Sequence, residues 1–238
     1  MTLRDKRVVI IGGSSGIGLA TAKAVAEEGA QIIIASRDES KLLAAKKQIK
    51  GDVSTKNLDV RSEEQIQRFF FDIDPFDYLI TPGSFTSPGS YLEMDIREAK
   101  DSFESKFWGQ YLAVKYGVPH MSKDGSIVLF SGVLSQRPTS NTAIMASINS
   151  AVEGLGRALA VELAPIRVNV ISPGYVDTPR FSHMKEKDRE MLFNHLGKQL
   201  PVGRIGRPEE IAQTVLYLLT NGYTTASTIY IDGGYSMR

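Results

Sequence analysis

The stretch Val8-Val9-Ile10-Ile11-Gly12-Gly13-Ser14-Ser15-Gly16-Ile17-Gly18 decides the fold. Its first four residues form an uninterrupted apolar run, which is typical of a strand covered on both faces of a sheet. Gly12 would permit a tight turn, Gly16 would let the backbone approach a pyrophosphate, and Gly18 would allow a helix to pack closely on the strand. The N–H groups at the start of that helix would face the phosphates. The stretch therefore predicts a dinucleotide-binding turn made of Gly12, Ser14, Ser15, Gly16, Ile17 and Gly18, with a glycine turn kept only for packing as the alternative.

Short apolar runs alternate with helical patterns along the rest of the chain. Besides the strand over 8–11, the pattern predicts strands over 32–35, 53–58, 78–80, 127–130, 167–171 and 228–231. It predicts helices over 16–29, 38–49, 62–72, 94–121, 143–163 and 208–220, with Asp38 capping the second of them. Because parallel strands need crossover connections, this order predicts a seven-stranded, mostly parallel sheet with helices on both faces. The fold class is thus a Rossmann-like, doubly wound α/β fold.

The 238 residues contain no repeat, no low-complexity tract and no linker that would divide them. We therefore expect a single domain over 1–238. The segment 175–200 is polar and lies between two well-formed units, so it is either a substrate lid or a plain surface excursion.

Composition excludes several classes of function. The chain has 28 basic and 27 acidic residues, a formal net charge of +1, which is too even for a nucleic-acid-binding surface. It has no cysteine, which excludes a disulfide scaffold, a thiolate zinc site and a cysteine nucleophile. No signal peptide and no apolar run of about 20 residues is present, so we expect a cytoplasmic protein that does not bind membranes. His183 and His195 lack metal-ligand spacing and are predicted to be surface residues, and no metal site is expected.

Several further motifs carry a resemblance to a known family. They are Gly12-x3-Gly16-x-Gly18, Leu58-Asp59-Val60, Ile166-Arg167-Val168-Asn169, Ser172-Pro173-Gly174, Thr178-Pro179 and Ile231-Asp232-Gly233-Gly234. In this order and spacing the sequence resembles the short-chain dehydrogenase/reductase family along nearly its whole length. The resemblance implies that the protein binds NAD or NADP and moves a hydride to or from a carbonyl carbon.

The resemblance also assigns individual contacts to the cofactor. It implies that Asp59 and Val60 meet the adenine, although Asp59 could instead cap the helix over 62–72. It implies that Pro173, Gly174 and Thr178 lie along the nicotinamide half. The turn Thr81-Pro82-Gly83-Ser84 replaces the family's usual Asn-Asn-Ala-Gly, and we count Gly83 among the cofactor contacts.

The choice between NAD and NADP follows from the end of the second strand. An NAD enzyme would place a carboxylate about 20 residues after the glycine turn, to hold the ribose 2′-hydroxyl. This chain has Ser36-Arg37 there. A guanidinium pairs well with a 2′-phosphate, whereas a carboxylate would repel it. We therefore predict NADP(H) as the cofactor, with Arg37 as a solvated charge at a strand end as the alternative.

The positions of the family's catalytic groups depart from its usual pattern. When the chain is aligned on Ala151-Val152-Glu153-Gly154-Leu155, the usual tyrosine falls on Met145 and the usual lysine on Asn149. The usual serine falls on Gly132, directly after Ser131, and the usual asparagine falls on Lys106. This exchange of lysine and asparagine resembles the ketoreductase domains of polyketide synthases. We predict Lys106, Ser131 and Asn149 as catalytic residues, with a chance alignment as the alternative.

The missing tyrosine leaves the proton donor open. Methionine has no proton to give. A buried Lys106 with a lowered pKa is one candidate, and Ser131, Ser135 or Tyr175 relaying a proton from water are others.

Three functions follow from these observations. The first is an NADP(H)-dependent oxidoreductase acting on a small-molecule carbonyl or alcohol, with specificity set by 84–92 and 175–200. The alternatives are a catalytically inactive cofactor-binding protein and a non-redox enzyme on the same scaffold. The resemblance also implies a homodimer or homotetramer in which the small-residue face of the helix over 143–163 pairs with its copy, with close packing of that face on the sheet as the alternative.

Overall fold

The computed structural model describes residues 3–83, 86–182 and 184–237, so Ser84 and His183 lie outside the described part of the chain. Seven strands form one sheet, in the order β3-β2-β1-β4-β5-β6-β7, and every neighbouring pair is parallel. The strands are β1 (Arg7–Ile11), β2 (Gln31–Ser36), β3 (Val53–Asn57), β4 (Phe76–Ile80), β5 (Met121–Phe130), β6 (Arg167–Pro173) and β7 (Thr228–Ile231). The predicted doubly wound fold is confirmed.

Helices follow most of the strands. They are α1 (Gly16–Glu27), α2 (Glu39–Lys46), α3 (Glu63–Phe71), α4 (Ile96–Phe103), α5 (Gly109–Gly117), α6 (Ala143–Glu162), α7 (Glu186–Lys198) and α8 (Pro208–Thr220). Asp38 caps α2 as predicted, because its carboxylate accepts a hydrogen bond from the Lys41 backbone N–H at 3.0 Å. No helix among the described residues is both long enough and apolar enough to cross a membrane.

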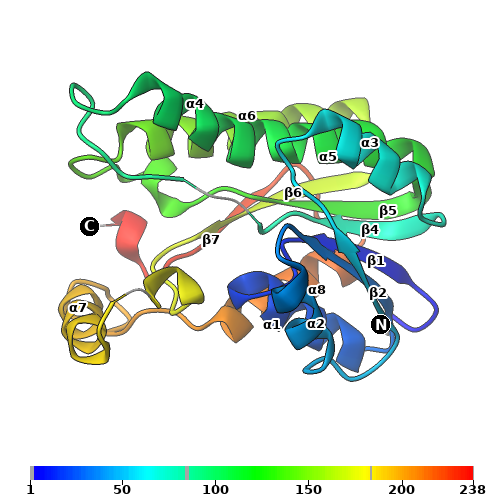
Figure 1. Cartoon of the computed structure of the whole chain (residues 1–238), viewed down its shortest axis with the longest axis horizontal. Coiled ribbons are helices and arrows are strands. Elements are labelled where there is room, and N and C mark those ends of the chain that lie inside the picture. Colours follow the sequence, from blue (N-terminus) through cyan, green and yellow to red (C-terminus); the bar gives the residue numbers. More distant parts are fainter. Residues whose placement is uncertain (1–2, 84–85, 183, 238) are drawn as a thin grey trace.

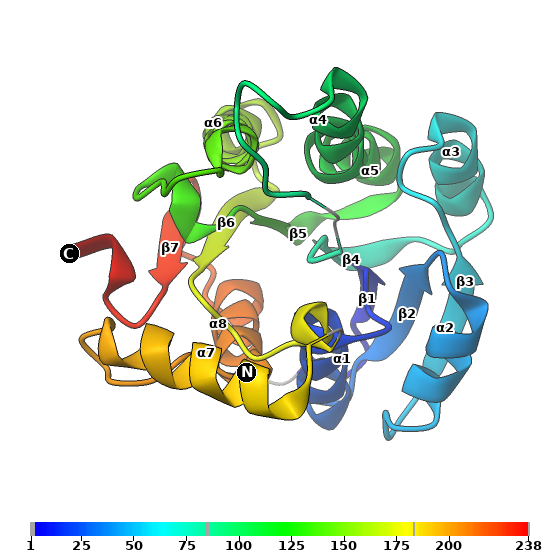
Figure 2. The same cartoon turned by 60° about the vertical axis from the view of Figure 1, so that its left-hand side comes forward.

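The sheet separates two hydrophobic cores. Along β1, Val8 and Ile10 belong to the core shared with α1 and α8, while Val9 and Ile11 belong to the core shared with α3, α5 and α6. Successive side chains of a strand point to opposite faces, so an unbroken apolar run fills both cores at once. Figures 1 and 2 show the two helical layers, with α1, α2 and α8 on one side and α3, α5 and α6 on the other.

The prediction of one continuous helix over 94–121 is wrong, because the helical region is divided into several parts. The chain forms α4, then a π-helical turn over Glu104–Trp108, then α5 and a short 3-10 turn over Val118–His120. Strand β5 then begins at Met121 rather than at the predicted Ile127. The prediction missed this start because most of the first residues of β5 are polar and give no apolar signal. A π turn inserts one residue into a helix and is frequent at functional sites.

The segment 175–200 contains a helix that the sequence pattern did not predict. Helix α7 has acidic residues in its first turn and His195 and Lys198 in its last turn, which suits the helix dipole. His195 is exposed there, as predicted for a surface residue. The prediction failed because α7 buries little apolar surface and therefore shows weak hydrophobic periodicity.

Candidate active site

The turn after β1 lies directly against the turn after β4. Gly12 has a φ of +95°, and a Cβ atom placed on it would lie 2.2 Å from the Cα atom of Gly83. The Gly83 N–H donates to the Ile11 carbonyl at 3.0 Å. Two glycines are therefore required where these backbones meet, and the structure brings the predicted residues Gly12 and Gly83 together.

The start of α1 has the features of an anion site. Its N-cap, Ser15, makes no side-chain capping bond, and the first turn has no acidic residue. By contrast, side chains cap α2, α3 and α4, namely Asp38, Ser62 and Asp95. Gly16 has a φ of +52°, and its Cβ would lie 3.3 Å from the Thr178 Cβ. The first N–H groups of α1 are thus left without a side-chain cap, with Thr178 beside them.

The end of β2 carries the two residues predicted to select the cofactor. The Ser36 hydroxyl is buried and has no hydrogen-bond partner among the described residues. Arg37 is exposed, and within the described ranges its guanidinium makes no ion pair with a carboxylate. The Arg37 backbone carbonyl is held by Asn57 Nδ2 at 2.9 Å. A buried hydroxyl without a partner, followed directly in the chain by an arginine, fits a phosphate ligand.

Asp59 is held by Arg61 rather than by a helix end. The Arg61 guanidinium donates to both carboxylate oxygens of Asp59, at 3.2 and 2.8 Å, and this pairing lowers the pKa of Asp59. Ser62 caps α3, so the alternative interpretation of Asp59 as the cap is wrong. Val60 packs against α5, since a Cβ on Gly109 would lie 3.0 Å from the Val60 Cβ.

The motif Asp232-Gly233-Gly234 near the end of the chain packs against Gly174. A Cβ on Gly174, which directly follows Pro173 at the end of β6, would lie 2.7 Å from the Asp232 Cα. The Asp232 carboxylate in turn accepts the backbone N–H groups of Gly234 and Ser236 at 2.8 and 2.9 Å. The motif around Asp232 therefore packs against the loop after β6 and fixes its position.

The three residues predicted to be catalytic meet at one point. Lys106 Nζ donates to the Ser131 carbonyl at 2.8 Å and to Asn149 Oδ1 at 2.7 Å. They come from the π turn, from the residue after β5 and from α6. A Cβ on Gly132 would lie 3.0 Å from Asn149 Nδ2, so the glycine leaves room for the amide. Lys106 and Asn149, whose exchange the sequence predicts, are thus in direct contact.

The environment of Lys106 weakens its hold on a proton. Burial lowers the pKa of Lys106 to about 7, and repulsion from the Arg180 guanidinium adds to this, while Glu153 acts in the opposite direction. Arg180 comes from the loop after β6. Its guanidinium donates to the carbonyl of Thr86, which lies in the loop after β4, at 3.2 Å. An ammonium with a pKa near neutrality is suited to general acid–base chemistry.

Glu153 is a site residue that the sequence reasoning did not single out. It is only 5% exposed, yet its carboxylate accepts hydrogen bonds from Ser131 Oγ at 2.7 Å, Ser135 Oγ at 2.5 Å and the Tyr230 hydroxyl at 3.2 Å. Its spacing gave a usable signal, because a residue four positions after Asn149 lies on the same face of the helix. Glu153 holds the two serines that were proposed as proton relays.

Tyr175 is less suited than Lys106 to donate a proton. Burial raises the pKa of Tyr175 above its ordinary value, with the neighbouring Tyr235 adding to the effect. The two rings pack edge to face, 5.4 Å apart. Ser131 and Ser135 already donate their hydroxyl hydrogens to Glu153. Among the candidates named from the sequence, Lys106 therefore has the most favourable chemistry.

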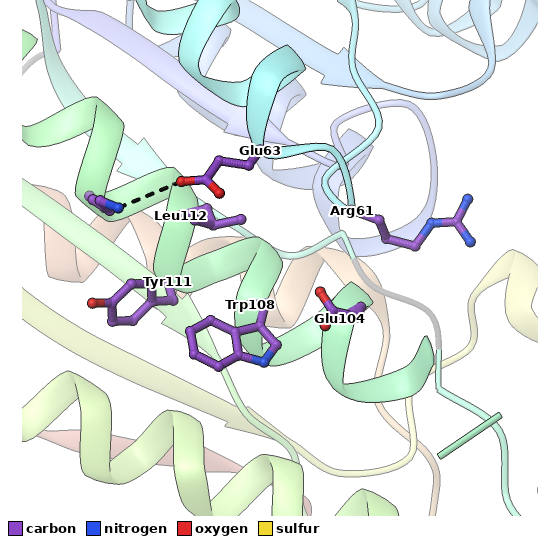
Figure 3. Close-up of a pocket in the computed structure, with 7 residues that line it drawn as sticks. Arg61, Glu63, Glu104, Trp108, Tyr111 and Leu112 are labelled. Atoms are coloured by element: carbon purple, nitrogen blue, oxygen red, sulfur yellow. Dashed lines mark ion pairs between the residues drawn. The ribbon is translucent and has the colours of Figure 1, made fainter. Parts of the chain in front are cut away.

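A pocket of about 440 Å³ lies on the outer side of the same π turn. Figure 3 shows Trp108, Tyr111 and Glu104 on this side of the helix, with Glu63 paired to Lys115 at 3.6 Å across it. Lys106 belongs to the same turn but contacts Ser131 and Asn149 instead. The outer pocket is therefore distinct from the candidate active site.

The chain is similar to known proteins along nearly its whole length. A family model described as "Enoyl-(Acyl carrier protein) reductase" matches residues 12–236. The chain is 31% identical to dehydrogenase/reductase SDR family member 6 of Rattus norvegicus, with 99% of each chain covered. It is also 31% identical to a 3-oxoacyl-[acyl-carrier-protein] reductase of Thermotoga maritima, covering 98% of this chain and 99% of that protein. A crystal structure of a small-chain dehydrogenase in complex with NADPH is 35% identical, with a TM-score of 0.86, over 98% of this chain and 99% of the other.

Proposed function

The chain belongs to the short-chain dehydrogenase/reductase family, and on that basis we propose that it is an NADP(H)-dependent oxidoreductase acting on a ketone or alcohol. The observation that carries this proposal is the contact of Lys106 Nζ with both Ser131 O and Asn149 Oδ1. It supplies a proton-donating group although Met145 stands where the family has its tyrosine.

The chain has groups suited to each part of NADP(H). The glycine turn from Gly12 to Gly18 and the uncapped start of α1 would bind the pyrophosphate. Ser36 and Arg37 would bind the 2′-phosphate, and Thr178 would lie along the nicotinamide half. The NADPH complex of a similar dehydrogenase supports this choice. The bound cofactor would supply the hydride for carbonyl reduction.

Lys106 is proposed to act as the general acid. A lysine ammonium has three N–H donors, and the described residues engage two of them, at Ser131 O and Asn149 Oδ1. The third would donate its proton to the carbonyl oxygen as the carbonyl carbon receives the hydride, which gives the alcohol and a neutral lysine. Water then returns a proton to the lysine. In the direction of alcohol oxidation, the neutral amine accepts the hydroxyl proton.

Asn149 and Glu153 prepare Lys106 for this role. Asn149 Oδ1 orients the ammonium without adding a negative charge, so the lowered pKa of Lys106 is preserved. Glu153 lies one helical turn further and holds Ser131, whose carbonyl is the other acceptor. The attraction of the Glu153 carboxylate opposes the lowering of the pKa of Lys106 and so keeps part of the lysine population protonated at neutral pH.

Turnover against a panel of ketones and aldehydes tests the proposal. We expect NADPH oxidation by the wild-type protein and a fall of about 10²–10⁴-fold in kcat for Lys106→Ala, with NADPH affinity largely unchanged. Lys115→Ala is the matched control, because Lys115 lies on the outer side of α5 and pairs with Glu63. Tight NADPH binding without any oxidation would instead support an inactive cofactor-binding protein.

We also propose that the whole chain works as one domain and that 175–200 covers the bound substrate. Phe181 of the short turn after β6 packs edge to face on Phe193 of α7, 5.2 Å apart, so this segment has an internal contact of its own. Slower proteolysis of α7 in the presence of NADPH and substrate would support a lid. Equal rates with and without them would leave it a surface excursion.

Self-association is a further part of the proposal. Trp108 and Tyr111 are large, partly exposed aromatic residues on the outer side of the π turn and α5, and α6 lies in the same helical layer (Figure 2). We propose that this layer packs against a second copy. A molar mass of a dimer or tetramer by light scattering, reduced by Trp108→Glu, is expected, and a monomeric wild-type protein would refute it.

A further inference from the structure

Gln110 is a buried polar residue for which the proposed reaction has no role so far. It lies in α5, one turn after Lys106, and is only 2% exposed. A buried carboxamide is costly unless each of its polar groups is hydrogen-bonded, so its partners indicate what it holds in place.

The Gln110 carboxamide makes four hydrogen bonds. Its Nε2 donates to the Lys106 carbonyl at 2.8 Å and to the Phe130 carbonyl at 3.0 Å. Its Oε1 accepts from the Phe130 backbone N–H at 2.8 Å and from the Thr81 hydroxyl at 2.8 Å. A glutamine has two N–H donors and two acceptor lone pairs, so its capacity is fully used.

These partners lie at both ends of the contact made by Lys106. One is the backbone of Lys106 itself, within the π turn. Another is Phe130, the residue before Ser131, whose carbonyl accepts the Lys106 ammonium. The third is Thr81, which precedes the turn that packs Gly83 on Gly12. One side chain thus joins α5, the end of β5 and the loop after β4.

We propose that Gln110 is a positioning residue for Lys106, fixing both the π turn that carries the lysine and the strand end whose carbonyl holds its ammonium. This inference rests on the proposed role of Lys106. Without these bonds, the π turn and β5 would separate enough to admit water around the ammonium. The charged groups that face the lysine, Arg180 and Glu153, would remain in place.

The test is an NMR titration of the Lys106 side chain in protein enriched with ¹³C-lysine. The Lys106 signal is assigned by its loss in Lys106→Arg. In Gln110→Met, which keeps the length of the side chain and removes all four bonds, we expect the pKa of Lys106 to rise by about one unit or more, because water restores the charged form. A pKa unchanged from the wild type in the folded variant would overturn the inference.

Two further variants make the result decisive. Asn169→Leu is the matched control, since Asn169 is fully buried and bonds Thr224 O at 2.8 Å and Ser227 N at 3.2 Å away from Lys106. It should lower stability comparably and leave the pKa of Lys106 unchanged. If Gln110→Met does not fold, Thr81→Val removes one of the four bonds of Gln110, together with the 3.4 Å contact of the Thr81 hydroxyl with the Val128 carbonyl, and should give a smaller rise in the same direction. No rise in Thr81→Val would then overturn the inference.

The same measurements separate this inference from the proposed function. The difference in the pKa of Lys106 between the wild type and Gln110→Met tests the role of Gln110. The pKa of Lys106 in the wild type, together with NADPH oxidation, tests the proposal that Lys106 is the general acid. A lowered wild-type pKa without turnover would overturn the oxidoreductase proposal and leave the role of Gln110 standing.

Discussion

At the scale of single residues, the candidate site depends on a contact between two side chains. Lys106 and Asn149 are 43 positions apart, and their side chains meet at 2.7 Å. Their spacing in an alignment suggested the exchange, but alignment cannot show that two side chains touch. The pKa of Lys106 depends on burial and on Arg180, which comes from a distant loop. The alignment identified Lys106 and Asn149 as candidates, and the tertiary surroundings of Lys106 set its pKa.

Arg37 provides a prediction at this scale. If its guanidinium binds the 2′-phosphate, Arg37→Asp should weaken NADPH binding about 10–100-fold, since a charged hydrogen bond is worth about 1.5–3 kcal/mol. Fluorescence titration with NADPH and NADH measures the change. NADH binding should weaken much less.

Arg68→Asp is the control for this substitution. The Arg68 side chain is 82% exposed on α3, so the same change of charge there should leave NADPH affinity unaltered. Equal losses in the two variants would point to net charge rather than to a phosphate contact at Arg37.

At the scale of elements, the turns after the parallel strands carry the site. The turn after β1 and the turn after β4 meet with backbone on backbone at Gly12 and Gly83. The π turn between α4 and α5 carries Lys106, with Gln110 one turn later. Helix periodicity correctly indicated a long helical region there. It did not predict the π turn, because that turn is held by side-chain bonds to β5 and to the loop after β4.

The Gly12 turn gives a prediction with a matched control. Gly12→Ala should lower the free energy of unfolding by about 2–4 kcal/mol, because the methyl group meets the Gly83 backbone in addition to the strain of a positive φ. Gly203 has a φ of +77° and no atom within 4 Å of an added Cβ. Gly203→Ala should therefore lose only about 1–2 kcal/mol.

Chemical denaturation and NADPH titration check both glycine variants. NADPH affinity should fall in Gly12→Ala and persist in Gly203→Ala. A similar loss of stability in the two would mean that the close approach of the two turns contributes little.

At the scale of the whole molecule, the sheet gathers groups from distant parts of the chain at one edge. All strand pairs are parallel, so the segments after β1, β2, β4, β5 and β6 leave the sheet on the same side. The phosphate turn, Arg37, Gly83, Ser131 and Gly174 follow these five strands in that order. The geometry of the candidate site at this edge thus depends on the integrity of the whole sheet.

Burial of Lys106 should make global stability depend on pH. The pKa of Lys106 is about 7 in the folded protein and near 10.5 when unfolded. Between these values the unfolded chain binds the additional proton, so stability rises with pH across this window. The free energy of unfolding of the wild type should increase relative to Lys106→Met by up to about 1.4 kcal/mol per pH unit.

Denaturant titrations between pH 7 and pH 10 measure this difference. Comparison with Lys106→Met cancels the other titrating groups. A difference that stays flat across the window would show that Lys106 keeps its ordinary pKa in the folded protein.

The sequence by itself determined the order of the seven strands and of the helices other than α7, the glycine turn and the choice of Lys106, Ser131 and Asn149 as candidates. The strands, the helices and the glycine turn follow from periodicity and glycine stereochemistry, which are local properties, whereas the three residues were singled out by the resemblance to a known family. Only the tertiary structure decided the π turn, the buried Glu153 and the four bonds of Gln110. Each depends on partners from other segments, brought together by the parallel sheet, and no local pattern records such contacts.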